Sequence, residues 1–304
     1  MPSRFVRTAL PPTVSLEPGR GGLPCLSIVN PLANAEVYLH GAHVTAWRPE
    51  GHDPVLWMSQ ASSWDAAKPI RGGVPICFPW FGPHATDKSA PSHGYARLQD
   101  WALVEARDDQ RGATELVFEM TPAAPPSAAW PHAVAARYHV TVGSSLALAL
   151  EVHNPGPEAF AFEEALHTYF VVQDVRAIEI SGLAGTDYVD KVGGTSNRTQ
   201  GPEPIRFTAE TDRVYVNTQA ACTIHDPGAR RRIVVRKSRS NATVVWNPWV
   251  DKARAMPDFG DDEWPAMVCV ETGNVNVHAV TLAPGARHTM SATIDVVPDV
   301  QPGV

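Results

Sequence analysis

One histidine and two glutamates interrupt an otherwise apolar run, FEEALHTYFVV, at residues 162–172. Strand-like alternation of this run puts Glu163, Ala165, His167 and Tyr169 on one face. Histidine can give and take a proton near neutral pH, so His167 is a candidate proton-transfer residue with a carboxylate on its own face. The alternative, a hydrogen-bonded histidine of the core or the surface, stays open for any single one of the twelve histidines.

A second glutamate, Glu271, lies between Val270 and Thr272 in the strand-like run MVCVETGNV. A carboxylate on a half-buried strand loses hydration unless nearby groups compensate for it. In a cleft with hydrogen-bond donors such a group can act as a general base with a tuned pKa, and elsewhere it can be a paired structural charge. Both interpretations of Glu271 remain open at this stage.

Two arginines lie in glycine-bearing, loop-like stretches, Arg71 in KPIRGGVPICFPWFGP (68–83) and Arg97 in SHGYARLQDW, which also contains His93. A guanidinium offers a planar fork of donors that can bind a carboxylate or a phosphate bidentately. The glycine pair matches neither the P-loop nor the dinucleotide fingerprint, because both need a following helix, which the prolines of the same run oppose. The arginines are therefore candidate anion ligands, with salt-bridged surface arginines as the alternative.

Other clusters give weaker signals for chemistry. His40 and His43 have a spacing that metal sites use, yet no further ligand lies near them in the sequence, so we expect no metal. The four cysteines are far apart and lack the close spacing of zinc or redox motifs. The basic run RRRIVVRKSRS at 230–240 alternates like a solvated strand.

Charge and hydropathy exclude several classes of function. The formal charge of −7 and the pI near 5.9 argue against a general binder of nucleic acid or anionic membranes. No run approaches the roughly 18 apolar residues of a membrane span, and the N-terminal stretch lacks an apolar core of signal-peptide length. We therefore expect a cytoplasmic protein without a membrane or nucleic-acid partner.

The chain reads as a succession of short strands. Its 28 prolines and 22 glycines leave little room for long helices, and no helices alternate with the strands, so an all-β fold is expected, a large antiparallel β-sandwich with few short helices. We expect one helix at 249–256, a low-complexity loop at 121–131, and a single domain over 1–304 with its core at about 25–297. Strands are predicted at 25–30, 35–40, 43–47, 54–58, 114–120, 137–142, 145–154, 162–172, 177–183, 213–218, 222–226, 231–238, 243–248, 267–272, 278–285 and 288–297.

Six motifs in collinear order resemble the hexose-6-phosphate mutarotases, or glucose-6-phosphate 1-epimerases, of the aldose 1-epimerase superfamily. The resemblance implies a galactose-mutarotase-like supersandwich, no cofactor, and a site that interconverts the anomers of a hexose 6-phosphate, most simply glucose 6-phosphate; we expect a monomer. The motifs are KPIRGGVPICFPWFGP, SHGYAR, ALHTYF, TDRVYVNT, VVWNPWVDKARAMPDF and MVCVETGNV.

The same resemblance assigns roles to individual residues. His167 corresponds to the general acid and Glu271 to the general base, while Arg71 and Arg97 correspond to arginines that would face the phosphate. The remaining residues that the resemblance places at the substrate are Asp212, which would hold sugar hydroxyls, and the neighbours His93 and Ser92. The family commonly has glutamine where this chain has Ser92, so we expect the shorter side chain to leave a sugar hydroxyl to water.

An acid and a base on separate strands match the demand of hemiacetal opening, which removes a proton from the anomeric hydroxyl and delivers one to the ring oxygen. Three other functions are compatible with the sequence. They are a mutarotase of free aldoses, which would not need two arginines for a dianion; a sugar-phosphate binder without activity; and a β-sandwich that only mediates assembly.

Overall fold

The structure is a computed structural model that describes residues 4–120 and 129–299. The strands are β1 (Val14–Pro18), β2 (Pro24–Val29), β3 (Ala33–Tyr38), β4 (His43–Pro49), β5 (Ile76–Cys77), β6 (Trp101–Asp108), β7 (Thr114–Met120), β8 (Ala135–Val142), β9 (Ser145–His153), β10 (Phe160–Phe162), β11 (Glu164–Leu166), β12 (Tyr169–Val171), β13 (Glu179–Ser181), β14 (Asp187–Asp190), β15 (Ser196–Thr199), β16 (Thr211–Val216), β17 (Cys222–Asp226), β18 (Arg231–Ser238), β19 (Ala242–Asn247), β20 (Met267–Asn274), β21 (Val280–Leu282) and β22 (Arg287–Pro298). The helical elements are α1 (Trp249–Ala255) and the 3₁₀ turns η1 (Arg20–Gly22), η2 (Ala96–Leu98), η3 (Trp264–Ala266) and η4 (Asn276–His278).

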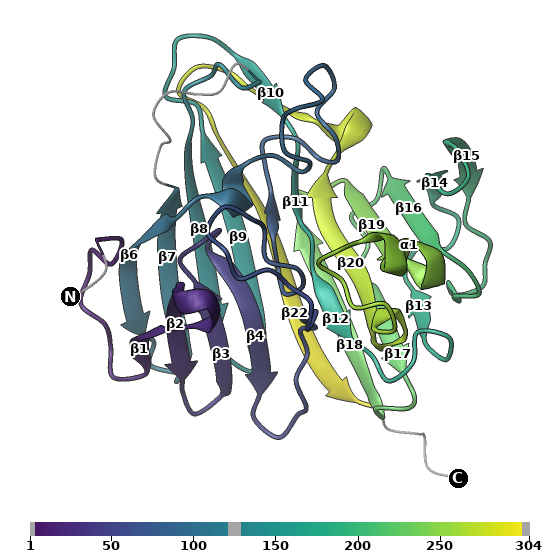
Figure 1. Cartoon of the computed structure of the whole chain (residues 1–304), viewed down its shortest axis with the longest axis horizontal. Helices are drawn as coiled ribbons and strands as arrows, with labels where there is room; N and C mark the ends of the chain where they lie inside the picture. The colour runs from purple at the N-terminus through teal and green to yellow at the C-terminus, as the bar shows by residue number, and fades with distance from the viewer. Residues whose placement is uncertain (1–3, 121–128, 300–304) are drawn as a thin grey trace.

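Three antiparallel sheets make up most of the molecule. A long sheet in the order β13-β17-β18-β22-β9-β8-β7-β6 forms one layer. The four-stranded sheet β1-β2-β3-β4 and the sheet β15-β14-β16-β19-β20-β11-β5 form the other layer, with β3 against β8 and β20 against β22 (Figure 1). The expected antiparallel β-sandwich with few short helices is therefore confirmed.

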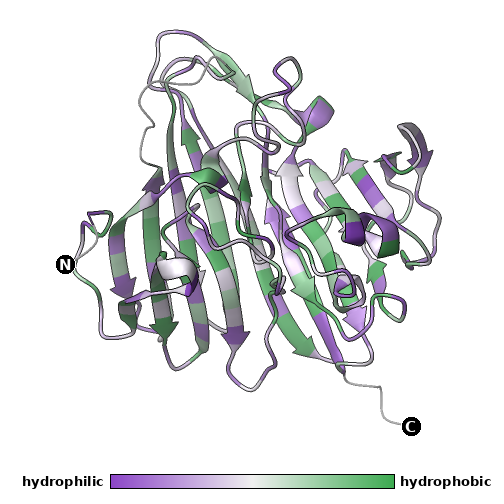
Figure 2. Cartoon of the chain, viewed as in Figure 1, coloured by the Kyte–Doolittle hydropathy of each residue, from purple (hydrophilic) through white to green (hydrophobic). Residues whose placement is uncertain are grey.

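Burial along the strands follows from this layering. In β9 every second residue is buried, and Figure 2 shows the resulting alternation of hydrophobic and hydrophilic bands along the strands of the long sheet. In β20 all eight residues are buried, so both faces of this strand are covered. A charged residue on β20 is thus held in a site with little water, and Glu271 is such a residue.

Two predictions about local structure need correction. The predicted strand at 54–58 is reduced to isolated bridges, Leu56 with Phe170 and Met58 with Gly72. The predicted strand at 162–172 is broken into β10, β11 and β12. Most of the predicted loop at 121–131 lies outside the described residues. The predicted helix at 249–256 is confirmed as α1.

No helix within the described residues has the length and apolar character needed to cross a bilayer.

Candidate active site

Strand register brings His167 and Glu271 together. Leu166 of β11 lies opposite Thr272 of β20, and Tyr169 of β12 lies opposite Cys269, so the intervening His167 faces Glu271. Residues directly opposite in an antiparallel pair point to the same face of the sheet. His167 Nε2 is 3.3 Å from Glu271 Oε1, and the two residues that sequence reasoning singled out separately form one pair.

Burial controls the protonation of this pair. Glu271 is 1% exposed and His167 8%. Burial raises the pKa of Glu271 well above its usual value, with the Asp212 carboxylate adding to the effect. Burial also lowers the pKa of His167 to about 3, with Arg71 and Arg97 acting in the same direction. Burial therefore disfavours the charged form of each member of the pair.

The strand break after β11 gives His167 its position. The His167 N–H donates to the Pro75 carbonyl at 3.0 Å, and the Tyr169 N–H donates to the Gly73 carbonyl at 2.9 Å. These bonds join the strand of the histidine to the RGGVP stretch. Gly73 has φ +59°, and a Cβ there would lie 2.3 Å from the Val44 carbonyl oxygen, so this turn requires glycine.

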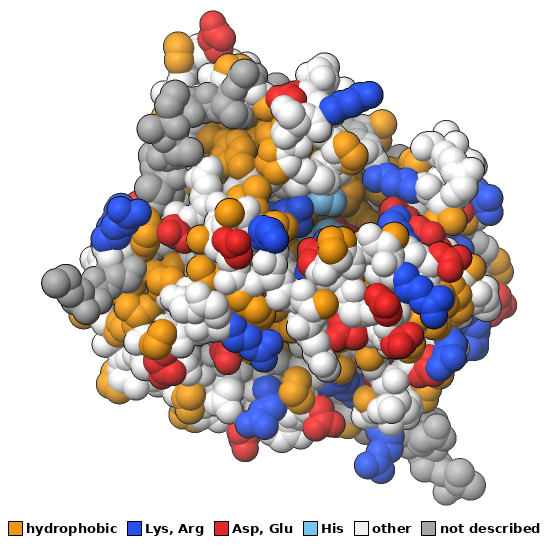
Figure 3. Space-filling model, in the orientation of Figure 1, with side chains coloured by type: hydrophobic (Ala, Val, Ile, Leu, Met, Phe, Trp, Pro, Cys, Tyr) orange, Lys and Arg blue, Asp and Glu red, His pale blue; other side chains and the backbone are white. Residues whose placement is uncertain are grey.

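Aromatic rings enclose the histidine. The His167 ring stacks on Tyr169, with centroids 4.8 Å apart and an interplanar angle of 14°, while Trp246 meets it edge-on at 6.0 Å. His93 approaches edge-on from another side, at 5.6 Å. Figure 3 shows histidine in a hollow near the centre of this face, with cationic side chains close by. The hollow has apolar walls and a few convergent polar groups, as small-molecule sites commonly do.

Arg71 is held by a carboxylate that the sequence analysis did not single out. Its Nε and Nη2 donate to both oxygens of Asp258 at 3.0 to 3.2 Å, and its Nη1 donates to the Tyr169 hydroxyl at 3.0 Å. The Nε–Nη2 edge of the guanidinium, which could otherwise bind a phosphate bidentately, is therefore already occupied by Asp258. Arg71 retains N–H capacity on Nη1, next to the ring that stacks on His167.

Arg97 is buried and lacks a carboxylate partner among the described residues. Its Nη2 donates to the Ser92 carbonyl at 2.8 Å, and its Nε has no partner in the described part of the chain. Burial lowers the pKa of this guanidinium. Ser92 itself is exposed, and its contact with the site is the backbone carbonyl that accepts the Arg97 hydrogen bond.

His93 belongs to a turn that needs a special backbone. It has φ +64°, and the following Gly94 has φ +72°, where a Cβ would lie 2.0 Å from the Phe78 carbonyl oxygen. The His93 Nδ1 accepts the Gly82 N–H at 3.2 Å, and its ring packs edge-on against Phe81 at 4.8 Å. Burial lowers the pKa of His93 well below its usual value, which indicates a neutral imidazole beside His167.

Asp212 lies on β16, on the sheet face that carries His167 and Glu271. It is opposite Trp246, which is opposite Cys269 on β20. Burial raises the pKa of Asp212, and Lys191 and Lys252 oppose that shift. The Lys252 Nζ lies 3.9 Å from an Asp212 carboxylate oxygen. All the predicted site residues thus surround or support one hollow, which also includes Lys191, absent from the sequence-based set.

Glu163 does not share the role suggested by strand alternation. Because the run breaks at this residue, its carboxylate instead accepts the N–H groups of Phe81 at 2.9 Å and Asn276 at 2.5 Å. It therefore ties two loops together, and the partner of His167 is Glu271.

The ligand atoms of His167, Cys269 and Glu271 lie within 4.8 Å of one another, so they could hold a soft divalent cation. The cationic charges of Arg97 and Lys191 oppose such an ion at this place, since both act on Glu271. The His40 and His43 rings do not form a metal pair, because their Nε2 atoms bond the carbonyls of Lys68 and Gly72, respectively.

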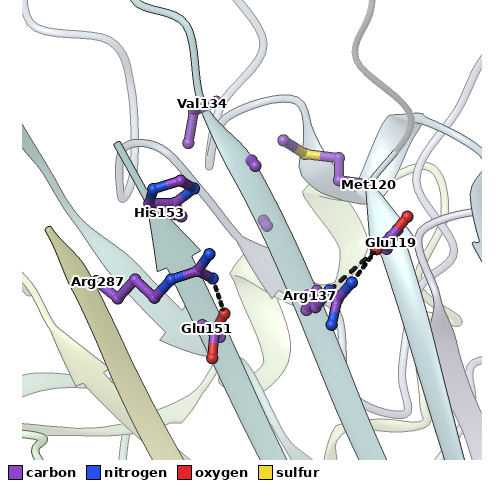
Figure 4. Close-up of a pocket in the computed structure, with 9 residues that line it drawn as sticks. Glu119, Met120, Val134, Arg137, Glu151, His153 and Arg287 are labelled. Carbon is purple, nitrogen blue, oxygen red and sulfur yellow. Dashed lines mark hydrogen bonds and ion pairs between the residues drawn. The ribbon is translucent and has the colours of Figure 1, made fainter. Parts of the chain in front are cut away.

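A separate pocket of about 360 Å³ lies at β7, β8, β9 and β22 (Figure 4). Its arginines are both paired, Arg137 with Glu119 at 2.6 Å and Arg287 with Glu151 at 2.5 Å. None of the predicted site residues lines it. Its cationic charge is neutralised locally, and the hollow around His167 remains the candidate active site.

Comparisons with known proteins agree with this geometry. Residues 24–295 match the family model described as aldose 1-epimerase. A protein of Escherichia coli K12, provisionally named glucose-6-phosphate 1-epimerase, is 36% identical over 250 residues, which is 82% of this chain and 83% of that one. A Cenchrus ciliaris protein with the same provisional name is 33% identical over 274 residues, covering 87% of this chain and 82% of the relative.

A solved structure extends the comparison to three dimensions. The crystal structure of a Salmonella typhimurium protein, provisionally described as a mutarotase, superposes with a TM-score of 0.87 at 33% identity, covering 95% of each chain. The galactose-mutarotase-like fold expected from the motifs is confirmed. The chain belongs to the aldose 1-epimerase family.

Proposed function

We propose that the protein interconverts the α and β anomers of a hexose 6-phosphate, with glucose 6-phosphate as the foremost substrate. The observation that carries the proposal is the contact of 3.3 Å between His167 Nε2 and Glu271 Oε1 in a buried hollow beside cationic groups. The provisional name of the relatives supports the choice of substrate.

The contact between His167 and Glu271 suits the two halves of the reaction. In ring opening, His167 gives its proton to the ring oxygen while Glu271 takes the proton of the anomeric hydroxyl, and the bond between the first carbon and the ring oxygen breaks. The aldehyde then rotates about its first carbon-carbon bond. In closure the hydroxyl adds to the other face of the carbonyl, its proton returns to His167, and Glu271 protonates the new anomeric oxygen.

The surroundings favour this cycle. A dianionic substrate near His167 stabilises the imidazolium form, which burial alone disfavours. The stack on Tyr169 fixes the ring plane of His167, so the proton is delivered along one direction. Each proton transfer by a positioned side chain contributes about 10² to 10⁴ in rate, sufficient for a reaction that already proceeds in water.

The remaining site residues take binding roles in this proposal. Arg97, with its unpartnered Nε, faces the phosphate, and Arg71 donates its remaining Nη1 hydrogen to a sugar oxygen. Asp212 accepts sugar hydroxyl protons, and neutral His93 contributes a ring nitrogen beside the reacting carbon. Ser92 supports Arg97 through its carbonyl.

We also propose a domain organisation, an oligomeric state and a cellular location for the enzyme. We expect one catalytic domain, because a single core cluster joins residues from Val14 to Ile294 across both layers. A cytoplasmic location fits the buried free thiols of all four cysteines, and we expect a monomer.

The test compares two substrates of the wild-type protein. Polarimetry with freshly dissolved α-glucose 6-phosphate and free α-glucose gives kcat/KM for each. We expect turnover of both with a preference of at least about 100-fold for the phosphorylated sugar, the gain from two or more contacts to a charged group. Equal efficiency would favour a mutarotase of free aldoses, and no acceleration of either would favour a binding protein.

A further inference from the structure

The charges around the hollow are not equally available to a substrate. The Asp258 carboxylate neutralises Arg71 through the two-point contact described above. Asp258 is not free to leave, because the next residue, Phe259, is 2% exposed and packs against Trp57 at 4.9 Å and Trp246 at 6.4 Å. Arg71 thus brings an oriented donor to the site but little net positive charge.

The same loop is fixed on its other side. The Glu263 carboxylate accepts the Ser59 hydroxyl at 2.7 Å and the Gln60 N–H at 2.9 Å, and it accepts the Gly260 N–H at 3.0 Å. These bonds hold the turn that follows Asp258. The turn therefore keeps the Asp258 backbone next to the Arg71 fork.

Two cations near the catalytic pair have no carboxylate partner among the described residues. Within residues 4–120 and 129–299, neither Arg97 nor Lys191 has a carboxylate oxygen within 4.0 Å. Lys252, by contrast, is paired with Glu210 at 2.8 Å. The positive charge available for an anionic substrate therefore belongs to Arg97 and Lys191.

Contacts place the ammonium of Lys191 at the hollow. The residue follows β14, and its N–H donates to the Asp212 carbonyl at 2.9 Å. Its Nζ lies 5.0 Å from the centre of the Phe81 ring. Phe81 packs on His93, which packs on His167, so the ammonium is separated from the catalytic histidine by two rings. A cation over an aromatic face is weakly held and can exchange this contact for an anion.

We propose that Lys191 is a further substrate-binding residue, and that its ammonium acts with the Arg97 guanidinium, rather than with the Arg71 fork, to hold the phosphate. This inference rests on the proposed function and adds the charge pair that selects the phosphorylated sugar. Two cations match the two negative charges of a phosphate monoester, while the fork of Arg71 stays with Asp258. Lys191 also acts electrostatically on Glu271 and His93, the groups that Arg97 influences.

The test measures binding of inorganic phosphate by calorimetry at fixed ionic strength. Lys191→Met should raise the dissociation constant for phosphate about tenfold or more, as loss of a charge-assisted contact does. The control Lys68→Met removes the same net charge at an exposed position and should change it by less than about twofold. The dissociation constant of the charge-conserving double variant Arg71→Met with Asp258→Asn should stay within about threefold of the wild-type value. The positive and negative charges that it removes already neutralise each other in the wild type.

Steady-state kinetics complete the test. Lys191→Met should raise KM for glucose 6-phosphate about tenfold while KM for free glucose changes by less than about threefold. Phosphate binding by Lys191→Met at wild-type strength, failure of wild type to bind phosphate, or loss of phosphate binding in the Arg71/Asp258 double variant would overturn the inference. Wild-type turnover of glucose 6-phosphate is scored separately, so the proposed function can stand when this inference fails, and the reverse.

Discussion

The buried histidine His43, which contacts the turn that follows Arg71, should make the stability of the fold depend on pH. His43 is fully buried, and its Nε2 lies 2.7 Å from the Gly72 carbonyl, to which the neutral ring donates. Burial lowers its pKa from 6.5 to about 3, and the neighbouring His40 and Arg97 act in the same direction. Near pH 5 the unfolded chain therefore binds a proton at this histidine that the folded chain does not, so acid favours unfolding.

The magnitude follows from that difference in proton binding. The stability contributed by neutral His43 is complete above its ordinary pKa of 6.5 and is lost as the pH falls toward about 3. Between about pH 7.5 and pH 5 the loss at this one site amounts to about 2 kcal/mol. His43→Gln keeps a donor for the Gly72 carbonyl but cannot titrate. Its free energy of unfolding relative to wild type should therefore shift by about 2 kcal/mol in favour of the variant over this interval.

Urea unfolding at the two pH values measures the shift. For an m value of roughly 2 to 3 kcal/mol per M, the difference between the two midpoints should change by about 0.7 to 1 M. Val44→Ala, at a fully buried neighbour on the same strand, should instead destabilise the fold by the same amount at both pH values. A His43→Gln difference that is constant with pH would refute the reasoning, because it would mean that His43 does not stay neutral in the folded protein.

Three further outcomes follow from the structure. Arg97→Met should raise KM for glucose 6-phosphate about tenfold, with partial recovery in Arg97→Lys because an ammonium lacks the fork; unchanged KM values would remove Arg97 from the site. Phe259→Ala should cost about 3 to 5 kcal/mol in urea unfolding, since the ring fills the space between two tryptophans, and a cost below about 1 kcal/mol would contradict that packing. Glu164→Ala should cost about 1 to 3 kcal/mol, because Asn274 and His288 each lose a buried partner at 2.9 Å; a stability equal to wild type would show that the contacts are dispensable.

The sequence was most informative where chemistry and strand pattern coincide. The runs around His167 and Glu271 predicted two polar residues in strand interiors, and the register of β11, β12 and β20 explains why they face each other. Their pairing could not be read from the runs alone, because residues more than 100 positions apart meet only through sheet order. Alternation within one run suggested Glu163 as the carboxylate on the histidine face, and the strand break at that residue made this wrong.

The arginines show the limit of reading motifs one at a time. A glycine-bearing loop with Arg71 predicts an anion ligand, but the anion found there is Asp258, 187 positions further along the chain. Lys191 gave little signal, since it follows the short strand β14, which was not among the predicted strands. An unpaired cation is recognised only when the carboxylates around it are known, and these come from loops that the folded sheet brings together.

The most direct test of the catalytic pair is exchange NMR of glucose 6-phosphate at anomeric equilibrium, which reports interconversion without a coupling enzyme. His167→Asn and Glu271→Gln should each lower the catalysed exchange rate by at least about 100-fold with an unchanged circular dichroism spectrum, and the double variant should be little worse than the poorer single one. Near-wild-type exchange in either folded single variant, or losses that add in the double variant, would contradict a pair that acts as one acid/base unit.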